Sequence, residues 1–514
     1  MYVRRPVKID LGHIGELSIT NLPGSCGNPI SISPIIAHTG ILSIFSTGFC
    51  IGILHYDDIM KVHFEKKGSA LMKKFAFIGA GSLQFTTSCM RDLLTFPAFK
   101  DCEIALMDLN PNNLENVYKV CQRIKEAMEC PDCRITTTTD RVEALKGADG
   151  VLCTVFNGGI DIWRHDIEIP KKYGVDINIG DTRSVSGIFR ALRNIPLLLD
   201  ICKDIETYCP HAVFLNYTNP MAMLSGYMQR YTGIETVGLC HSVQVCSEKL
   251  LKKLGMEDKV EGRRELIAGI NHMGWLLELE DKDGNDLYPE VRRRALEKNE
   301  AAMKDGAEKH DDMVRMDYIR RFGYYCTESS EHNAEYNMYY IKSKYPELIE
   351  RYNIPLDEYP RRCVNQIAGW AKERDELKTG KHLDHQRTKE YASYIMESIV
   401  NSTPYEIGGN VLNKGGLIEN LPQDACVEVP CLVNGKGVHP CRVGRLPVQC
   451  AAMNMTNINV QLLTIEAAVT RKKEHIYQAA MLDPHTGSEL DMDTIVRMVD
   501  DLIDAHGSWL PQYK

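Results

Sequence analysis

From residue 72 onward, short apolar runs alternate with longer amphipathic stretches. Each run ends at small or polar residues, as buried strands do; the runs are 75–78, 103–107, 150–155 and 212–216. The stretch 111–128 carries its apolar residues on one helical face, namely Leu114, Val117, Tyr118, Cys121, Ile124 and Met128. Strands that alternate with helices predict an α/β fold with a doubly wound, Rossmann-type parallel sheet.

Local signals refine the expected helices. Asn110 before Pro111 is typical of a helix N-terminus. The helix expected over 188–208 contains Pro196, which predicts a kink or break at that point. The charged stretch 288–321 is expected to be helical, with its Lys, Arg and Glu side chains on a solvated face.

Residues 1–71 differ from the rest of the chain. No charged residue occurs between Glu16 and Asp57, and Ile35–Leu54 is mostly apolar. Its length would admit a membrane span, but polar residues and glycines dilute it. Met72 begins a segment that resembles the start of a cytoplasmic enzyme. We therefore expect residues 1–71 to be upstream sequence, translated from an early start codon and outside the fold.

The composition is that of an ordinary globular protein. The chain has 514 residues, of which 44% are hydrophobic and 25% charged, and its net charge is −9. These values exclude a mostly disordered chain and give no basic surplus for binding nucleic acid. The 18 cysteines are scattered, which favours reduced thiols in a cytoplasmic protein over a secreted disulfide scaffold.

A glycine turn follows the first strand and points to a dinucleotide. Gly79, Gly81 and Ser82 lie between that strand and a helix, where backbone amides can approach a pyrophosphate. Asp108 ends the second strand, and an acid there suits the 2′-hydroxyl of NAD. The third fingerprint position is Gln84, so a fold that binds another nucleotide, or none, remains the alternative.

Four further segments carry reactive side chains after expected strands or helices. Cys240 and His272 could form a two-ligand site for a borderline divalent metal, although an isolated Cys and His are usually unrelated. Asn219 can bond a hydroxyl or simply form a turn. The segment 322–332 contains Tyr, Glu and His side chains, which serve acid–base chemistry or a helix end.

Taken together, these segments resemble glycoside hydrolase family 4 from about Met72 to the C-terminus. The matching motifs are Gly79–Ser82, Gly180–Thr182, Ile188–Arg193, Asn216–Met221, Cys240–Gln244, Gly269–His272 and Thr327–His332. The sequence Cys-His-Ser-Val-Gln is similar to the branch of bacterial α-galactosidases (melibiases). The resemblance implies an NAD-binding domain over 72–232 and a catalytic α+β domain over 233–514, similar to the C-terminal domain of lactate and malate dehydrogenases.

The resemblance also implies cofactors and roles. Such an enzyme uses NAD and a divalent metal, usually Mn²⁺, to hydrolyse α-glycosides such as α-galactosides through oxidation at C3, deprotonation at C2, elimination, water addition and re-reduction. Cys240 and His272 match the metal ligands. Tyr324 matches the base, with Tyr325 as the competing register. His241 stands at the proton donor's position and Asn219 at that of a substrate-binding residue. A homodimer or homotetramer is implied.

One loop departs from the family pattern. Relatives have a glycine-rich loop after Gly180-Asp-Thr182, whereas this chain has Arg183 followed by Ser184, Val185 and Ser186. Arg183 could pair with a substrate carboxylate, so an α-galacturonidase or α-glucuronidase stays open beside an α-glucosidase; a surface arginine is the plain alternative. Trp163 could stack on a sugar or pack in the core. A lactate- or malate-type dehydrogenase and a non-catalytic NAD-binding protein are the rival functions.

Overall fold

The computed structural model describes residues 73–358, 361–365, 368–369 and 386–514 with their side chains, and the backbone of six strands within residues 1–72. Met1–Leu71 and Met72–Lys514 are two compact units, and each is described by itself. The first contains two three-stranded antiparallel sheets. Their strands are β1 (Lys8–Leu11), β2 (Leu17–Thr20), β3 (Ser31–Ile32), β4 (Ile35–Ile36), β5 (Ile41–Ser46) and β6 (Phe49–His55). The apolar stretch considered as a membrane span thus contains β-strands, and no helix among the described residues is long and apolar enough to cross a membrane.

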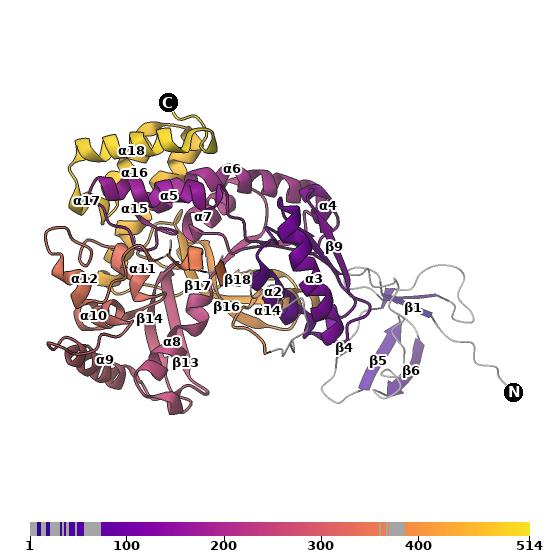
Figure 1. The fold of residues 1–514 in the computed structure, drawn as a ribbon. Helices are drawn as coiled ribbons and strands as arrows, with labels where there is room; N and C mark the ends of the chain where they lie inside the picture. Colours follow the sequence, from indigo (N-terminus) through magenta and orange to yellow (C-terminus); the bar gives the residue numbers. More distant parts are fainter. Residues whose placement is uncertain are drawn as a thin grey trace. The chain divides into compact units, whose positions relative to one another are not determined.

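The second unit is built on one twelve-stranded sheet (Figure 1). Six strands run parallel in the order β9-β8-β7-β10-β11-β12, which is the strand order of a doubly wound dinucleotide fold. They are β7 (Lys74–Ile78), β8 (Glu103–Met107), β9 (Arg134–Thr138), β10 (Gly150–Cys153), β11 (Val213–Asn216) and β12 (Thr236–Leu239). The predicted Rossmann-type sheet is confirmed.

The sheet continues beyond β12 with antiparallel strands. Their order is β16-β17-β13-β14-β15, and β18 pairs with β17. These strands are β13 (Arg264–Ile270), β14 (Met273–Glu280), β15 (Tyr325–Cys326), β16 (Tyr405–Leu412), β17 (Cys426–Asn434) and β18 (Gly437–Pro440). The antiparallel strands are therefore hydrogen-bonded directly to the parallel sheet through β12 and β16.

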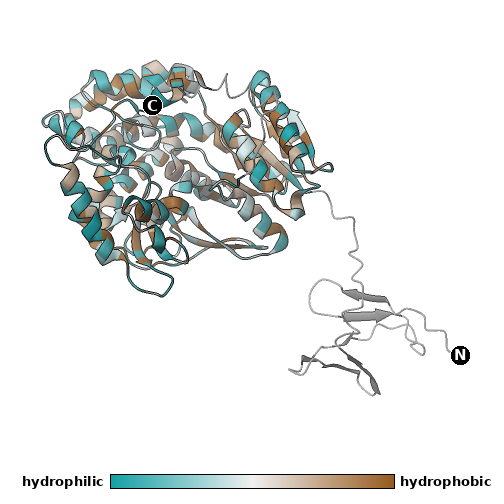
Figure 2. Cartoon of the chain, turned by 60° about the horizontal axis from the view of Figure 1, so that its bottom comes forward, coloured by the Kyte–Doolittle hydropathy of each residue, from teal (hydrophilic) through white to brown (hydrophobic). Residues whose placement is uncertain are grey.

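Helices cover the sheet, and most of them have a buried and an exposed side, with hydrophilic residues on the outside (Figure 2). Residues 184–195 are an exception, because they are buried on all sides. Those of the parallel half are α2 (Leu83–Leu94), α3 (Pro111–Ala127), α4 (Arg141–Leu145), α5 (Gly159–Lys172), α6 (Ser184–Tyr208) and α7 (Met221–Tyr231). Asn110 caps α3, because its Oδ1 accepts the amide hydrogens of Asn112 and Asn113. The helix α6 continues as one element through Pro196, so the break allowed for there does not occur.

The remaining helices belong to the antiparallel part of the sheet and to the C-terminus. They are α8 (His241–Lys253), α9 (Tyr288–Ala302), α10 (Met313–Phe322), α11 (Ser330–Glu335), α12 (Glu347–Arg351), α14 (Ala392–Asn401), α15 (Val448–Thr470), α16 (Lys473–Leu482), α17 (Thr486–Glu489) and α18 (Met492–His506). The charged stretch 288–321 forms two helices, and most of α10 is buried, so the expected solvated face holds only for α9. In Figure 1, α16 and α18 lie beside α5 and α6.

Candidate functional site

The glycine turn closes tightly around the end of β7. Gly79 adopts a φ of 84°, and a Cβ at this position would lie 2.7 Å from the carbonyl oxygen of Thr154. Thr154 follows β10, so the turn lies where the strand order reverses. At this point a doubly wound sheet opens a crevice for its ligand.

Asp108, which follows β8, and Gly81, which follows β7, are joined beside that crevice. The Asp108 carboxylate accepts the backbone amide hydrogen of Gly81 at 2.8 Å and that of Asn110 at 2.8 Å. Ser82 begins α2, whose first turn carries no acidic residue, so the positive end of this helix is not neutralised from within. The four residues predicted to bind the cofactor thus lie together, in a cradle that fits a dinucleotide.

Cys240 and His272 come from neighbouring parts of the same sheet. Cys240 follows β12 and caps α8, whereas His272 lies at the tip of the two-residue turn between β13 and β14, with a φ of 61°. Both are buried. Together with Glu328 they offer ligand atoms that all lie within 4.8 Å of one another. A thiolate, an imidazole and a carboxylate in one cluster suit a first-row divalent cation.

The two ring nitrogens of His272 face different partners. Nε2 lies 3.5 Å from Oε2 of Glu328. Nδ1 lies 3.2 Å from the hydroxyl oxygen of Thr182 and 3.1 Å from that of Tyr336. Burial lowers the pKa of His272 to about 4, so its imidazole is neutral near pH 7, as a metal ligand must be.

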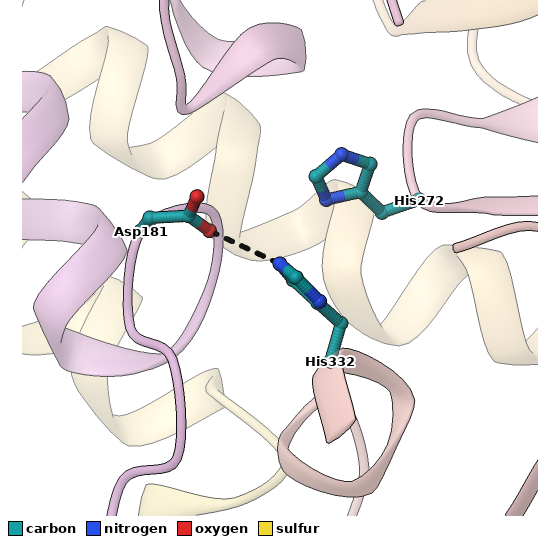
Figure 3. Close-up of side chains that lie close together, drawn as sticks. All are labelled: Asp181, His272 and His332. Carbon is teal, nitrogen blue, oxygen red and sulfur yellow. Dashed lines mark ion pairs between the residues drawn. The ribbon is translucent and has the colours of Figure 1, made fainter. Parts of the chain in front are cut away.

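His272 also belongs to a second group, with Asp181 and His332 (Figure 3). The three side chains come from the loop before α6, the β13–β14 turn and α11. Nε2 of His332 lies 3.6 Å from Oδ1 of Asp181. Burial opposes the charge on His332, but the carboxylates of Glu328 and Asp181 outweigh it and raise the pKa of His332 to about 9. This histidine is therefore a cation between two carboxylates.

Asn219 and His241 lie at the edge of this cluster. The side-chain amide of Asn219 donates to Oδ2 of Asp181 at 3.4 Å, and its Oδ1 is buried without a partner among the described residues. His241 is the first residue of α8, and 54% of its side chain is exposed. Its Nδ1 lies 3.8 Å from the carboxylate of Glu390.

The tyrosines are placed differently from the expectation. The Tyr324 ring packs edge-on against Tyr288, with centroids 5.9 Å apart, and the buried Tyr325 donates its hydroxyl hydrogen to Asp312 at 2.6 Å. The tyrosine whose hydroxyl contacts His272 is Tyr336. It lies four residues after His332 at the end of α11, and this helical spacing was the signal that could have identified it.

Arg183 is a buried residue. Its guanidinium stacks on the Tyr336 ring, 4.5 Å from the centroid, and Nη2 donates to the carbonyl oxygen of Asn271. The surface alternative is therefore wrong. Trp163 is fully buried in the core between helices and sheet, so core packing is the correct interpretation of that residue.

Two family models match the chain. Residues 74–256 match the model described as family 4 glycosyl hydrolase, and residues 267–486 match its C-terminal domain. An α-galactosidase of Bacillus subtilis is 54% identical over 444 residues, which span 86% of this chain and all of the relative. An α-galactosidase of Rhizobium meliloti is 37% identical over 453 residues, which span 86% of this chain and 89% of the relative.

Solved structures share the fold at lower identity. A 6-phospho-α-glucosidase from gut microorganisms, in complex with NAD and Mn²⁺, is 20% identical with a TM-score of 0.71 and covers 86% of this chain and 100% of its own. A 6-phospho-β-glucosidase of Thermotoga maritima is 19% identical with a TM-score of 0.68 and covers 85% and 100%. With two family models in sequence and a 54% identical relative matched over its whole length, this chain belongs to glycosyl hydrolase family 4.

Proposed function

We propose that this protein is an α-galactosidase that depends on NAD and a divalent metal, with Mn²⁺ as the leading candidate. One observation carries the proposal. Cys240 and His272 lie together at the same edge of the sheet as the glycine turn, in a chain 54% identical to an α-galactosidase over that protein's whole length.

The residues at both sites fit these cofactors. Gly79, Gly81, Ser82 and Asp108 would hold NAD, because side chains larger than hydrogen would collide at both glycines. Cys240 and His272 would hold the metal. When bound, NAD supplies a reversible hydride acceptor and the metal supplies Lewis-acid polarisation of sugar oxygens. Both types of chemistry make a sugar C–H bond acidic enough for a side-chain base.

We assign the base role to Tyr336 in place of Tyr324. Its hydroxyl lies at His272, whereas the Tyr324 ring packs against Tyr288. Burial and the Asp181 carboxylate raise the pKa of Tyr336 well above its ordinary value, and the Arg183 guanidinium over its ring offsets only part of that rise. The base role therefore rests on the position of the hydroxyl, and the Arg183 cation reduces the cost of the phenolate that would accept a proton from C2 of the sugar.

His241 and Asn219 keep the roles that the family resemblance implies. His241 follows Cys240 directly and is exposed enough to reach the oxygen of a leaving group. The Glu390 carboxylate beside it would orient the imidazole as it gives up a proton. Asn219 has a buried amide oxygen without a partner among the described residues, which suits a hydrogen bond from a sugar hydroxyl.

The placement of Arg183 bears on the glycone. Arg183 stacks on Tyr336 and donates a hydrogen bond to Asn271. We therefore infer that it holds these neighbouring residues in place. A uronide-specific enzyme would need this cation for the substrate carboxylate, so an uncharged galactoside is the better candidate. We further propose a cytoplasmic homo-oligomer, because a cysteine ligand requires a reducing compartment and the family resemblance implies a dimer or tetramer.

The test is nitrophenol release from p-nitrophenyl α-galactoside by the full chain. The reaction is run with NAD⁺, Mn²⁺ and a thiol reductant, and each is omitted in turn. We expect activity that disappears without NAD⁺ or Mn²⁺, and no accumulation of NADH, because the hydride returns to the sugar in each turnover.

Other outcomes separate the alternatives. Activity on an α-glucoside or α-uronide but not on the galactoside would keep the cofactor chemistry and overturn the glycone. Net NADH formation from a 2-hydroxy acid, with no glycoside cleaved, would return the protein to the dehydrogenases. Binding of NAD⁺ without turnover of any of these substrates would support a non-catalytic role.

A further inference from the structure

We propose that Glu328 is a third protein ligand of the divalent metal, and that His272 binds the ion through Nε2. The inference rests on the proposed function and extends its metal site beyond the pair Cys240 and His272. It begins with the segment 327–332, which follows β15 and includes the first turn of α11. In it Glu328 lies next to the cluster, while the other acid of that segment, Glu331, pairs with Arg362.

The distance between the two side chains matches two ligands of one ion. Nε2 of His272 and Oε2 of Glu328 lie 3.5 Å apart. Ligand atoms at about 2.1 Å from a shared cation lie roughly 3.4 Å apart at a tetrahedral angle and roughly 3.0 Å apart at a right angle. The Cys240 sulfur completes the group within 4.8 Å.

The backbone holds both residues in a costly conformation. His272 has a φ of 61° and Glu328 a φ of 66°. Residues with a side chain adopt this left-handed conformation only when the surroundings impose it, and such residues concentrate at functional sites. The strain occurs at two ligands from different elements, which favours a common cause at the point where they meet.

The competing group has less capacity for an ion. In the group of Asp181, His272 and His332, Nδ1 of His332 contacts the hydroxyl of Ser329 at 2.9 Å and Nε2 faces Asp181. The carboxylate of Asp181 accepts from Thr182 at 2.7 Å and from Asn219 at 3.4 Å. These side chains already have other partners. In the group with Cys240, the partner of the thiol among the described residues is the Ser242 hydroxyl at 3.1 Å, and Glu328 accepts the Ser329 amide hydrogen through Oε1 while its Oε2 faces His272.

Ligation through Nε2 also leaves Nδ1 of His272 free to form a hydrogen bond. Nδ1 then carries the hydrogen and donates it to Thr182 or Tyr336, which lie at 3.2 and 3.1 Å. Metal-binding histidines are held in this way by a partner on the second nitrogen. One thiolate, one imidazole and one carboxylate favour Mn²⁺, Fe²⁺, Co²⁺ or Zn²⁺ over Mg²⁺ and Ca²⁺, and they leave coordination positions for sugar oxygens.

The experiment measures metal binding directly, on the full chain freed of metal by a chelator. Mn²⁺ is titrated and its free fraction followed by electron paramagnetic resonance, and Co²⁺ is added separately for absorption spectra. We expect Glu328→Gln to weaken Mn²⁺ binding at least about tenfold and to change the Co²⁺ ligand-field bands. The thiolate-to-Co²⁺ band should persist in this variant and disappear in Cys240→Ser.

Matched variants test the assignment. Glu331→Gln, in the same segment, should bind Mn²⁺ like the parent, and Glu328→Asp, which keeps the carboxylate, should lose less affinity than Glu328→Gln. Unchanged NAD binding verifies folding of each variant. An unaltered affinity and Co²⁺ spectrum in Glu328→Gln, with Cys240→Ser impaired, would overturn this inference and leave the proposed function intact. Equal impairment in His332→Gln would move the ion to the other group, and an unimpaired Cys240→Ser would overturn the metal site altogether.

Discussion

The phenol hydroxyl of Tyr336 contacts Nδ1 of His272. This contact predicts that removing a single oxygen atom will lower activity. Replacing Tyr336 by Phe removes the hydroxyl that we propose as proton acceptor but keeps the ring beneath Arg183. We expect kcat on p-nitrophenyl α-galactoside to fall by about 10²-fold or more, the usual contribution of a positioned acid–base group. Steady-state kinetics at saturating NAD⁺ and Mn²⁺ measure this loss.

Tyr324→Phe is the control for that measurement, because this ring packs against Tyr288 outside the cluster. Its kcat should stay within about threefold of the parent. A large loss in Tyr324→Phe, with Tyr336→Phe active, would restore the assignment that the family motif favours.

Asp312 makes a pH-dependent contribution to stability. Burial would raise the pKa of its carboxyl, but Arg315 and Lys253 outweigh that and hold it at about 2, below the value of about 3.9 for an unfolded chain. Because the folded-state pKa is the lower one, the stabilisation is complete above about pH 4 and is lost as the pH falls toward 2. The shift corresponds to roughly 2 kcal/mol.

Asp312→Asn should therefore lower the thermal midpoint at pH 7, and the midpoint should fall less steeply below pH 4 than that of the parent. The neighbouring Asp311, whose side chain is 73% exposed, provides the control variant Asp311→Asn. Scanning calorimetry from pH 7 downward measures both. Parallel curves for the parent and Asp312→Asn would contradict the prediction.

The sequence could reveal a site residue where nearby residues determine its position, and could not where distant contacts determine it. Cys240 and His272 each follow a strand closely. The resemblance to the family motifs was enough to predict both as ligands of one metal. The contact of the Tyr336 hydroxyl with His272 could not be predicted, because the motif gives the order of side chains but not their direction. The burial of Arg183 rests on contacts with Tyr336 and Asn271, which are far from it in the sequence.

At the scale of elements, the turn from β7 to α2 depends on glycines, because its close contacts leave no space for a side chain. Gly81 has an ordinary φ, but a Cβ there would lie 2.5 Å from Oδ2 of Asp108. Gly81→Ala should push the Asp108 carboxylate away and weaken NAD⁺ binding about tenfold, or about 1.4 kcal/mol. Isothermal titration measures the Kd.

A second glycine tests whether the effect is local. Gly233→Ala introduces a methyl group whose nearest neighbour, Glu206, is 3.6 Å away, so NAD⁺ affinity should be unchanged. If both variants bind NAD⁺ like the parent, the turn does not hold the cofactor as proposed.

A buried ion pair anchors the C-terminal helix. Arg193 of α6 forms two hydrogen bonds with Asp166 of α5, at 3.1 and 2.6 Å, and His506 of α18 lies 2.8 Å from the same carboxylate. Both members of the ion pair are fully buried. Asp166→Asn would leave the Arg193 cation uncompensated, which costs about 3–5 kcal/mol.

Thermal unfolding measures that loss, and we expect the midpoint of Asp166→Asn to drop by several degrees. The control is Asp200→Asn, on the exposed side of α6. This substitution breaks only the ion pair with Lys203, in which both side chains are 61% exposed. It should change stability by no more than about 0.5 kcal/mol. A small effect in both variants would mean that the buried pair is dispensable.

Four strands of the parallel half, β7, β8, β10 and β11, could be predicted because each is a short apolar run next to an amphipathic helix, whereas β9 (Arg134–Thr138) is mostly polar and was not predicted. The burial of α10 could not be predicted, because Arg315 also stacks on the Tyr325 ring and Asp317 accepts hydrogen bonds from the hydroxyls of Tyr340 and Tyr352, contacts that only the fold creates. The helix through Pro196 shows the same limit, since packing between α5, α7 and α15 supports α6 along its length.

At the scale of the whole molecule, one sheet joins what the sequence presents as two domains. β12 pairs with β16, whose residues lie about 170 positions later, Gly238 opposite Asn410. No local pattern predicts a pairing over that separation. The continuity matters for function, because Cys240 follows β12 and is thereby fixed relative to both the glycine turn and the β13–β14 turn.

Residues 1–71 and 72–514 are two compact units, and this division leads to the last prediction. Every residue assigned to the site lies in 72–514, and the B. subtilis relative matches over its whole length within 86% of this chain. A protein that begins at Met72 should keep kcat/KM within about twofold, because a domain folds around its own core. Its thermal midpoint should match the main transition of the full chain. Loss of activity on this truncation, with NAD⁺ binding retained, would show instead that residues 1–71 contribute to catalysis.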